Sequence, residues 1–177
     1  GPLASVLTAE RTALNFLGHL SGVATSTAAY VAAAAAGGSA TVWDTRKTTP
    51  GLRALEKAAV RAGGGRNHRG NLSDWVLLKD NHISGIGITA AVARCADLWP
   101  GRSIHIECDR HDQMVEAIRA GATAVLLDNM TPDEVAACVA TAAELAGGGR
   151  RVLLEVSGGV TLATIGAYSA TGVDLVS

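Results

Sequence analysis

The sequence predicts an α/β protein in which helices cover a parallel β-sheet. Short, nearly continuous apolar runs alternate along the chain with longer stretches that have the spacing of helices. Continuous apolar runs are typical of strands buried on both faces, and their alternation with helices is typical of parallel sheets. Charged or glycine-rich turns separate the two kinds of segment. The expected strands lie near 40–44, 75–78, 103–106, 124–127, 152–154 and 173–176.

The first expected helix is long. Thr8 can cap it, and Gly37 would end it. Gly18 and Gly22 lie within this stretch, and they indicate either close approach by another segment or a break between two shorter helices. The later helices are expected at about 50–62, 87–98, 110–120, 132–146 and 161–170.

The helix expected at 50–62 follows the first strand across a short turn. Pro50 suits the first helical position, because its fixed φ and missing N–H cost nothing there. Leu52, Leu55 and Ala59 recur at helical spacing and mark one apolar face. Gly63 begins the glycine run that would end the helix.

The composition is that of an ordinary globular domain, and we expect one domain over residues 1–177. Hydrophobic residues make up 48% and charged residues 18% of the chain, enough for one substantial core. A net charge of −1 gives no general attraction to nucleic acid or to a membrane surface. Three scattered cysteines without Cys-x-x-Cys spacing, and no leader or membrane-spanning run, predict reduced thiols in a cytoplasmic protein.

Basic residues gather on both sides of the helix at 50–62. Arg46 and Lys47 lie in the turn before it, and Arg66, His68 and Arg69 follow it. Basic residues in turns are more often solvated surface groups when taken singly. If the helix packs back on its strand, however, the basic residues before the helix and those after it are brought toward one edge of the fold. Together they predict a pocket for an anion with more than one charged group.

Charged residues also close most of the expected strands, at Asp44, Lys79, Glu107, Asp128 and Glu155. In a parallel barrel the carboxyl ends of the strands share one rim, so these side chains would converge on a common mouth. An open doubly wound sheet would spread them along an edge, and the residues alone leave both folds open. Glu107 and Asp128 end consecutive strands and can hold a hard cation such as Mg²⁺ on a diphosphate.

Two further patterns carry less information. Ser157, Gly158 and Gly159 follow a strand and precede an expected helix, which is a weak signal for a phosphate-binding loop. The five histidines include no His-x-x-x-His pair on a helix, so their spacing predicts no metal site.

Three longer motifs carry a family resemblance. They read DTRKTTPGLRALEKAAVRAGGGRNHR at 44–69, LKDNHI at 78–83 and ERTALNFL at 10–17. Over essentially its whole length the chain resembles the quinolinate phosphoribosyltransferase family, also called nicotinate-nucleotide pyrophosphorylase (carboxylating). Several long motifs in one order are far more specific than a lone glycine-rich loop.

The resemblance implies a fold and an activity. The fold would be a TIM-like α/β barrel that is incomplete, with seven strands in the family. The activity would join quinolinate to 5-phosphoribosyl 1-diphosphate and give nicotinate mononucleotide, diphosphate and carbon dioxide in NAD biosynthesis. The resemblance further implies Mg²⁺ as cofactor and a homodimer or higher homo-oligomer with shared active sites, to which Arg11 of one subunit would contribute.

The resemblance also assigns roles to individual residues. The substrate-binding positions are Arg11, Arg46, Lys47, Thr48, His68, Arg69 and Lys79. The catalytic positions are Lys47, Lys79, Glu107 and Asp128, of which the two acids would also hold the metal. The phosphate-binding positions are Ser157, Gly158, Gly159 and Ser177.

Two departures from the family pattern limit this transfer. His105 stands where many members have glutamate, which affects the surroundings of Glu107. The resemblance covers the catalytic barrel domain without the family's amino-terminal domain and without the segment after Ser177, so we expect little or no turnover by these 177 residues alone. Two alternatives stay open: a related phosphoribosyltransferase for another aromatic acid, of the nicotinate or molybdenum-transport type, and a non-catalytic assembly or binding module.

Overall fold

The computed structural model describes residues 1–146, 149 and 151–177. Within them the chain forms one six-stranded sheet in the order β1-β6-β5-β4-β3-β2, and every neighbouring pair of strands is parallel. All six expected strands are present, with some boundaries shifted. They are β1 (Thr41–Val42), β2 (Val76–Leu78), β3 (Ile104–Cys108), β4 (Ala124–Asp128), β5 (Leu153–Ser157) and β6 (Leu175–Val176).

The helices agree with the expected pattern except at four places. The helices are α1 (Leu3–Gly37), α2 (Arg53–Ala62), α3 (Asp80–Ile83), α4 (Ile88–Leu98), α5 (His111–Ala120), α6 (Pro132–Ala146) and α7 (Ile165–Ala170). The first exception is Thr8, which does not cap α1, because the helix already begins at Leu3 and the Thr8 hydroxyl donates to Ala4 O at 2.8 Å within it. The short α3 was not predicted. α2 begins after Pro50 because Gly51, at φ +79°, first makes a turn. α7 begins at Ile165 rather than near 161, because the Thr161 N–H bonds to Thr164 Oγ1 in a local turn.

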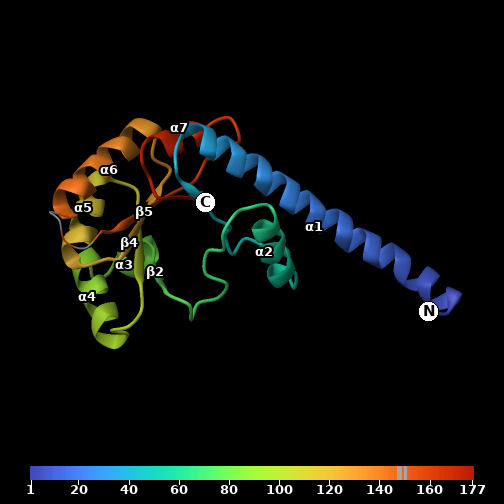
Figure 1. Ribbon diagram of the computed structural model, residues 1–177. Helices are drawn as coiled ribbons and strands as arrows, with labels where there is room; N and C mark the ends of the chain where they lie inside the picture. The colour runs from blue at the N-terminus through green and yellow to red at the C-terminus, as the bar shows by residue number, and fades with distance from the viewer. Residues whose placement is uncertain (147–148, 150) are drawn as a thin grey trace.

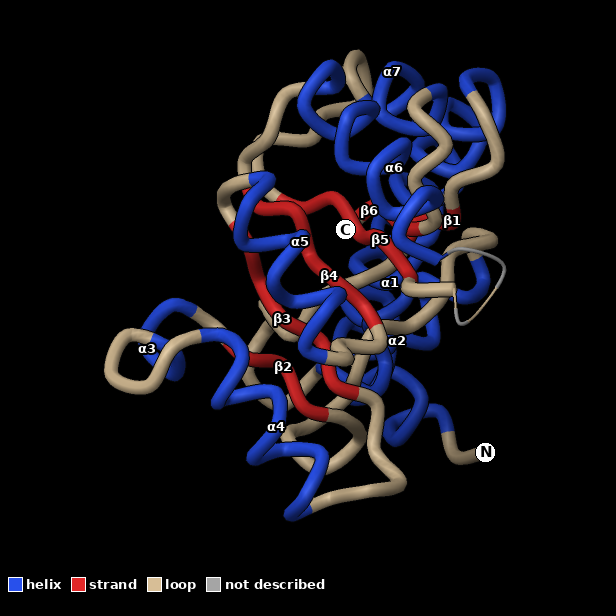
Figure 2. The backbone as a smooth tube through the Cα atoms, turned by 90° about the vertical axis from the view of Figure 1, so that its left-hand side faces the viewer, coloured by secondary structure: helices blue, strands red, loops and turns tan. Residues whose placement is uncertain are grey.

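The strand order is that of a parallel barrel that is open between β1 and β2. A doubly wound sheet reverses its strand order at the ligand site, whereas here β2 to β6 follow in sequence and β1 pairs with β6. Figure 2 shows β2 to β5 side by side in this order. The α/β fold and its incomplete barrel are therefore confirmed, with six strands in the described residues where seven were implied for the family.

The segment that follows α2 occupies the open side of the barrel. Arg66 forms a parallel bridge with Trp43, and the Arg66 N–H donates to Val42 O at 2.9 Å. The His68 ring lies 5.3 Å from the Trp43 ring and 5.0 Å from the Trp75 ring. Aromatic side chains thus fill the space where one more strand would otherwise join β1 to β2.

The two faces of the strands differ in character. On one face Ile106, Val125 and Val156 are fully buried, and α4, α5 and α6 lie along this side of the sheet (Figure 1). On the other face the residues next to them, Glu107 and Glu155, carry polar groups toward the inside of the barrel. Because side chains alternate along a strand, each strand supplies both the core and the lining of the barrel.

α1 is one unbroken helix whose first half projects away from the sheet (Figure 1). The break considered for Gly18 and Gly22 is therefore absent, and a Cβ at either residue would meet no atom within 4 Å. Close approach occurs instead at Gly37, where a Cβ would lie 2.0 Å from the backbone oxygen of Gly166 on α7. Despite the length of α1, none of the helices in the described residues is long and apolar enough to cross a membrane.

The apolar face predicted for α2 is wrong. Leu55 is 45% exposed, whereas Glu56 and Lys57 are buried beside Ala59. Glu56 accepts from the Thr49 N–H at 3.1 Å, and Lys57 pairs with Asp44. Charged side chains with buried partners therefore form the inner face of this helix.

The three cysteines are buried free thiols. They are Cys95 on α4, Cys108 on β3 and Cys138 on α6. Burial raises the pKa of each thiol, and that of Cys108 reaches about 12. They therefore act as packing residues rather than as nucleophiles.

Candidate active site

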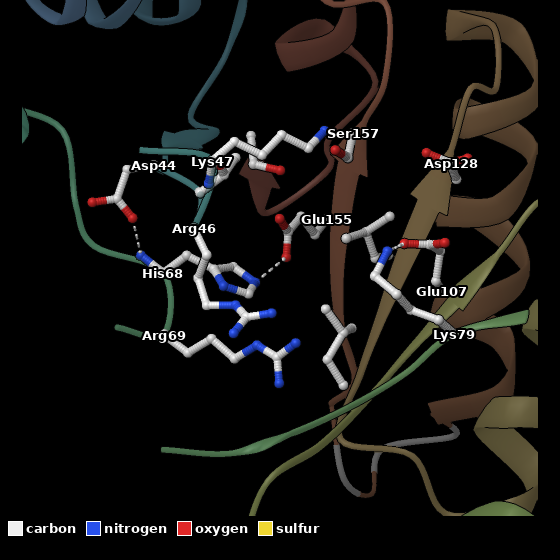
Figure 3. Close-up of a pocket in the computed structure, with 14 residues that line it drawn as sticks. Asp44, Arg46, Lys47, His68, Arg69, Lys79, Glu107, Asp128, Glu155 and Ser157 are labelled. Atoms are coloured by element: carbon white, nitrogen blue, oxygen red, sulfur yellow. Dashed lines mark hydrogen bonds and ion pairs between the residues drawn. The ribbon is translucent and has the colours of Figure 1, made fainter. Parts of the chain in front are cut away.

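A cavity of about 310 Å³ opens at the carboxyl ends of the strands (Figure 3). This is the end at which parallel barrels place their chemistry. The lining residues come from the turn after β1, the segment after α2 and the ends of β2 to β6. They are Asp44, Thr45, Arg46, Lys47, His68, Arg69, Leu77, Lys79, Glu107, Leu126, Asp128, Glu155, Ser157 and Ser177.

Most of the residues singled out from the sequence line this cavity. The structure brings together nine of them, namely Arg46, Lys47, His68, Arg69, Lys79, Glu107, Asp128, Ser157 and Ser177. They are drawn from segments far apart in the chain, and the barrel collects them at one mouth.

Five other predicted residues lie outside the lining, and one of them is Arg66, which is exposed. Arg11 is exposed on the projecting half of α1. Thr48 is on the turn beside the cavity, where its Oγ1 accepts from Arg53 Nε at 3.1 Å. Gly158 and Gly159 follow Ser157, with φ of +90° and +65°. These conformations favour glycine, but the residues beyond them form a loop rather than the helix start expected near 161.

One side of the cavity is basic. We call Arg46, Lys47, His68 and Arg69 the cationic cluster. Figure 3 shows the guanidinium groups of Arg46 and Arg69 side by side and pointing the same way. Among the residues that the structure describes, no carboxylate forms an ion pair with Arg46, Lys47 or Arg69. Two adjacent cations without counter-charges form a site for an anion.

The environment of Arg69 strengthens this conclusion. Arg69 is only 6% exposed, and its Nη1 donates to the Trp75 carbonyl at 3.3 Å, while its Nε has no partner in the described residues. Burial, and then the positive charge of Arg46, lower the pKa of the Arg69 guanidinium. A buried cation held beside a second cation is costly until an anion neutralises it.

The opposite side carries acids. We call Glu107, at the end of β3, and Asp128, at the end of β4, the acidic wall. Lys79 Nζ bonds to Glu107 Oε2, and Asp128 Oδ2 accepts from Asn129 Nδ2 at 2.7 Å. Two carboxylates on neighbouring strands are the hard oxygen donors that suit Mg²⁺, whose other ligands come from phosphate oxygens and water. The residues present therefore fit a magnesium ion bound together with a diphosphate.

His68 and Glu155 form the floor of the cavity, and with His105, which lies next to them without lining the cavity, they make a buried polar cluster. His68 Nε2 lies 3.4 Å from Glu155 Oε2, and the ligand atoms of all three residues lie within 4.8 Å of one another. Burial lowers the pKa of His105 to about 4, against the opposing charge of Glu155, so this imidazole is neutral near pH 7. Spacing could not reveal the cluster, because its members come from β3, β5 and the segment after α2.

Three lining residues were not predicted from the sequence, namely Thr45, Leu77 and Leu126, whereas Asp44 and Glu155 were predicted for the common mouth without a role in the site. The sequence contains a pattern that could have assigned some of them to the site. Leu77, Leu126 and Glu155 each precede by two positions a residue predicted for the site or its rim, and residues two apart on a strand share a face. Asp44 acts differently, because its carboxylate accepts from Lys57, from the His68 N–H at 2.8 Å and from Asn67 Nδ2 at 2.6 Å.

Comparisons with known proteins agree with this geometry. Residues 23–177 match the family model described as quinolinate phosphoribosyl transferase, C-terminal domain. The chain is 42% identical over 179 residues to a probable nicotinate-nucleotide pyrophosphorylase (carboxylating) of Bacillus subtilis, covering 100% of this chain and 60% of the relative. It is 45% identical over 179 residues to a protein of the same name from Synechocystis, covering 100% and 59%.

Solved structures give the same result. The nicotinate-nucleotide pyrophosphorylase of Francisella tularensis superposes with a TM-score of 0.90 at 40% identity, covering 98% of this chain and 60% of that one. The chain thus spans about 60% of the length of these relatives.

Proposed function

This chain belongs to the quinolinate phosphoribosyltransferase family, and we propose that its cavity joins quinolinate to 5-phosphoribosyl 1-diphosphate, with release of diphosphate and carbon dioxide. The product would be nicotinate mononucleotide, an intermediate of NAD biosynthesis. The proposal is carried by one observation. The guanidinium groups of Arg46 and Arg69, which form no ion pair with a carboxylate in the described residues, face into a cavity whose opposite side is acidic.

Quinolinate carries two neighbouring carboxylates, and the cationic cluster supplies charge for both. Arg46 and Arg69 present planar forks that can each bind a carboxylate through two hydrogen bonds. His68 lies on the floor beside them, where its Nε2 faces Glu155. Lys79 adds a positive charge on the acidic side of the cavity. A substrate with one carboxylate would leave part of this charge without a partner.

The phosphoribosyl end would lie toward β4 to β6. The side chain of Lys47 extends toward Ser157 in Figure 3, so its ammonium group is placed to neutralise a diphosphate leaving group. Ser157, Gly158 and Gly159 would bind the ribose 5-phosphate, with Ser177 beside them. Glu107 and Asp128 would hold Mg²⁺, which supplies further positive charge to the diphosphate oxygens.

The chain's residues then act by holding charges in place. Cations around the diphosphate favour its departure as the ribosyl carbon becomes positive. Once the pyridine nitrogen is ribosylated, its positive charge stabilises the electron pair that stays on the adjacent ring carbon when the carboxylate leaves as carbon dioxide. That carbon then takes a proton from water to give nicotinate mononucleotide. The protein therefore supplies orientation and electrostatics, and no covalent cofactor takes part in the proposal.

Calorimetric titration of the folded chain tests this proposal. We expect quinolinate to bind, and nicotinate, which lacks one carboxylate, to bind at least about tenfold more weakly, since an unpaired buried charge costs more than 1.4 kcal/mol. Mg²⁺ should strengthen binding of 5-phosphoribosyl 1-diphosphate and leave quinolinate binding nearly unchanged. Equal binding of the two acids would favour a different aromatic acid, and no binding by the folded chain would contradict the proposal.

We further propose that two copies of the chain pair through α1 and that Arg11 of each copy approaches the cavity of the other. Arg11 is exposed on the projecting half of α1, and Leu7, Leu14 and Leu17 are exposed on the same stretch. Exposed apolar side chains at this density mark an interaction surface. Sedimentation velocity should show a dimer, and Leu14→Glu should shift it to a monomer with unchanged helix content. A wild-type chain that stays monomeric at every concentration would contradict the pairing.

A further inference from the structure

We propose that Arg53, on α2, is a positioning residue that holds the two halves of the cationic cluster at a fixed separation. The inference rests on the proposed function only in naming the anion that benefits. One half of the cluster, Arg46 and Lys47, precedes α2, and the other half, His68 and Arg69, follows it. Arg53 lies in the first turn of the helix between them.

The guanidinium group of Arg53 contacts both halves at once. Its Nη2 donates to the carbonyl of Arg46 at 3.0 Å, and its Nη1 donates to the carbonyl of Gly70 at 3.0 Å. Its Nε donates to Thr48 Oγ1 at 3.1 Å. One planar group thereby fixes the backbone beside Arg46 and the backbone beside Arg69.

The position of the Arg53 contact matters because the other hydrogen bonds between the segments before and after α2 lie before Arg46 and Arg69 along the chain. In the part of the chain that the structure describes, the remaining hydrogen bonds between the two segments lie at 42–44 and 66–68, through Arg66, Lys57 and the Asp44 carboxylate. These bonds close one end of the pair of segments. Arg53 closes the other end, next to the side chains that face the cavity.

The charges explain why such a tie is needed. Arg46 and Arg69 repel each other, as the effect of Arg46 on the pKa of Arg69 indicates. Without an anion, no ion pair with a carboxylate in the described residues offsets this repulsion, and the charge of Asp74 counters it only partly, at Arg69. Hydrogen bonds from Arg53 to the main chain on both sides oppose the separation, so the cavity is formed before an anion arrives and less ordering is needed on binding.

Arginine is the residue suited to this task. Three acceptors in different directions require the fixed fork of a guanidinium group, whereas the ammonium group of lysine is a single point of charge on a flexible chain. Among the described residues Arg53 forms no ion pair with a carboxylate, so its charge is met by carbonyl and hydroxyl oxygens alone.

Three variants of the whole chain test the proposal: Arg53→Gln, Arg53→Lys and, as a matched control, Arg94→Gln. Arg94 is an exposed arginine on another helix, α4. Without ligand, hydrogen exchange of the backbone amides of residues 45–49 and 66–70 should be faster in both Arg53 variants than in the wild-type chain, and it should be unchanged in the control. Melting temperatures measured by circular dichroism identify any variant that fails to fold. If Arg53→Gln does not fold, the hydrogen exchange of Arg53→Lys, the milder change, decides the proposal.

Quinolinate titration gives the second readout. We expect the dissociation constant to rise about tenfold in Arg53→Gln, comparable to the loss of a hydrogen-bonded charged group, and to be only partly restored in Arg53→Lys. Full restoration by lysine would overturn the proposal, because charge alone would then suffice. Unchanged exchange at both segments would also overturn it. If the wild-type chain binds no quinolinate, the proposed function fails, and the exchange experiment still decides the role of Arg53.

Discussion

Replacement of Arg46 by alanine is expected to weaken quinolinate binding by about two orders of magnitude, the effect of losing a bidentate, charge-assisted contact in a partly enclosed site. Binding of 5-phosphoribosyl 1-diphosphate should change much less, since its proposed contacts are Lys47, Ser157 and the acidic wall. Calorimetry with each ligand in turn measures both effects.

The matched control for this change is Arg110→Ala. This change also removes an arginine, but one that lies outside the cavity lining. The side chain of Arg110 is 60% exposed beside Asp109 and Asp112. Arg110→Ala should leave the dissociation constants of both ligands unchanged. If Arg46→Ala weakens both ligands equally, the residue contributes only to the general field or to folding, and its proposed contact with the diacid is wrong.

The change Asp44→Asn is expected to lower the free energy of unfolding by about 3–5 kcal/mol, because it leaves a buried ammonium group without its counter-charge. Lys57 and Asp44 are each only 8% exposed in their side chains. Asp44 also accepts part-buried hydrogen bonds from the His68 main chain and from Asn67 through different oxygens, and asparagine would keep only one accepting oxygen, so one of these donors would lose its partner. Urea unfolding followed by circular dichroism gives the difference.

Two further variants separate this effect from ordinary charge loss. Asp109→Asn removes a carboxylate whose pair with Arg110 is exposed, and it should cost less than about 1 kcal/mol. The double change Asp44→Leu with Lys57→Met removes both buried charges and should recover part of the stability. An Asp44→Asn variant as stable as the wild-type chain would show that the pair is not buried in solution.

The sequence predicted the strands well because most of them are short apolar runs followed by a charge or a glycine. The same rule placed Lys79, Glu107 and Asp128 at one rim, and the structure puts all three on the cavity. The choice between barrel and open sheet could not be made from these runs. It depends on the pairing of β1 with β6, and no local pattern encodes that contact.

Failures of prediction have a common physical cause. The apolar face of α2 was misplaced because periodicity counts apolar residues, whereas Glu56 and Lys57 are buried through specific polar partners. Glu155 was predicted for the common mouth, but its burial was not, since a strand-end charge is ordinarily solvated and Glu155 is 1% exposed on the cavity floor. Arg53 was not noticed, since an arginine in the first turn of a helix is ordinarily a surface residue.

The pairing of β1 with β6 has a consequence for how the chain folds. From β2 to β6 each strand pairs with the strand that follows it in the sequence, so these contacts form between near neighbours along the chain. α1 packs against α2, which is nearer in the sequence, but it also packs against α7, and β1 pairs with β6; α7 and β6 come much later in the chain. Bringing such distant segments together carries the largest loop-closure entropy in the fold. The β1–β6 pairing and the α1–α7 contact are therefore expected to form later in folding than the contacts between strands that are neighbours in the sequence.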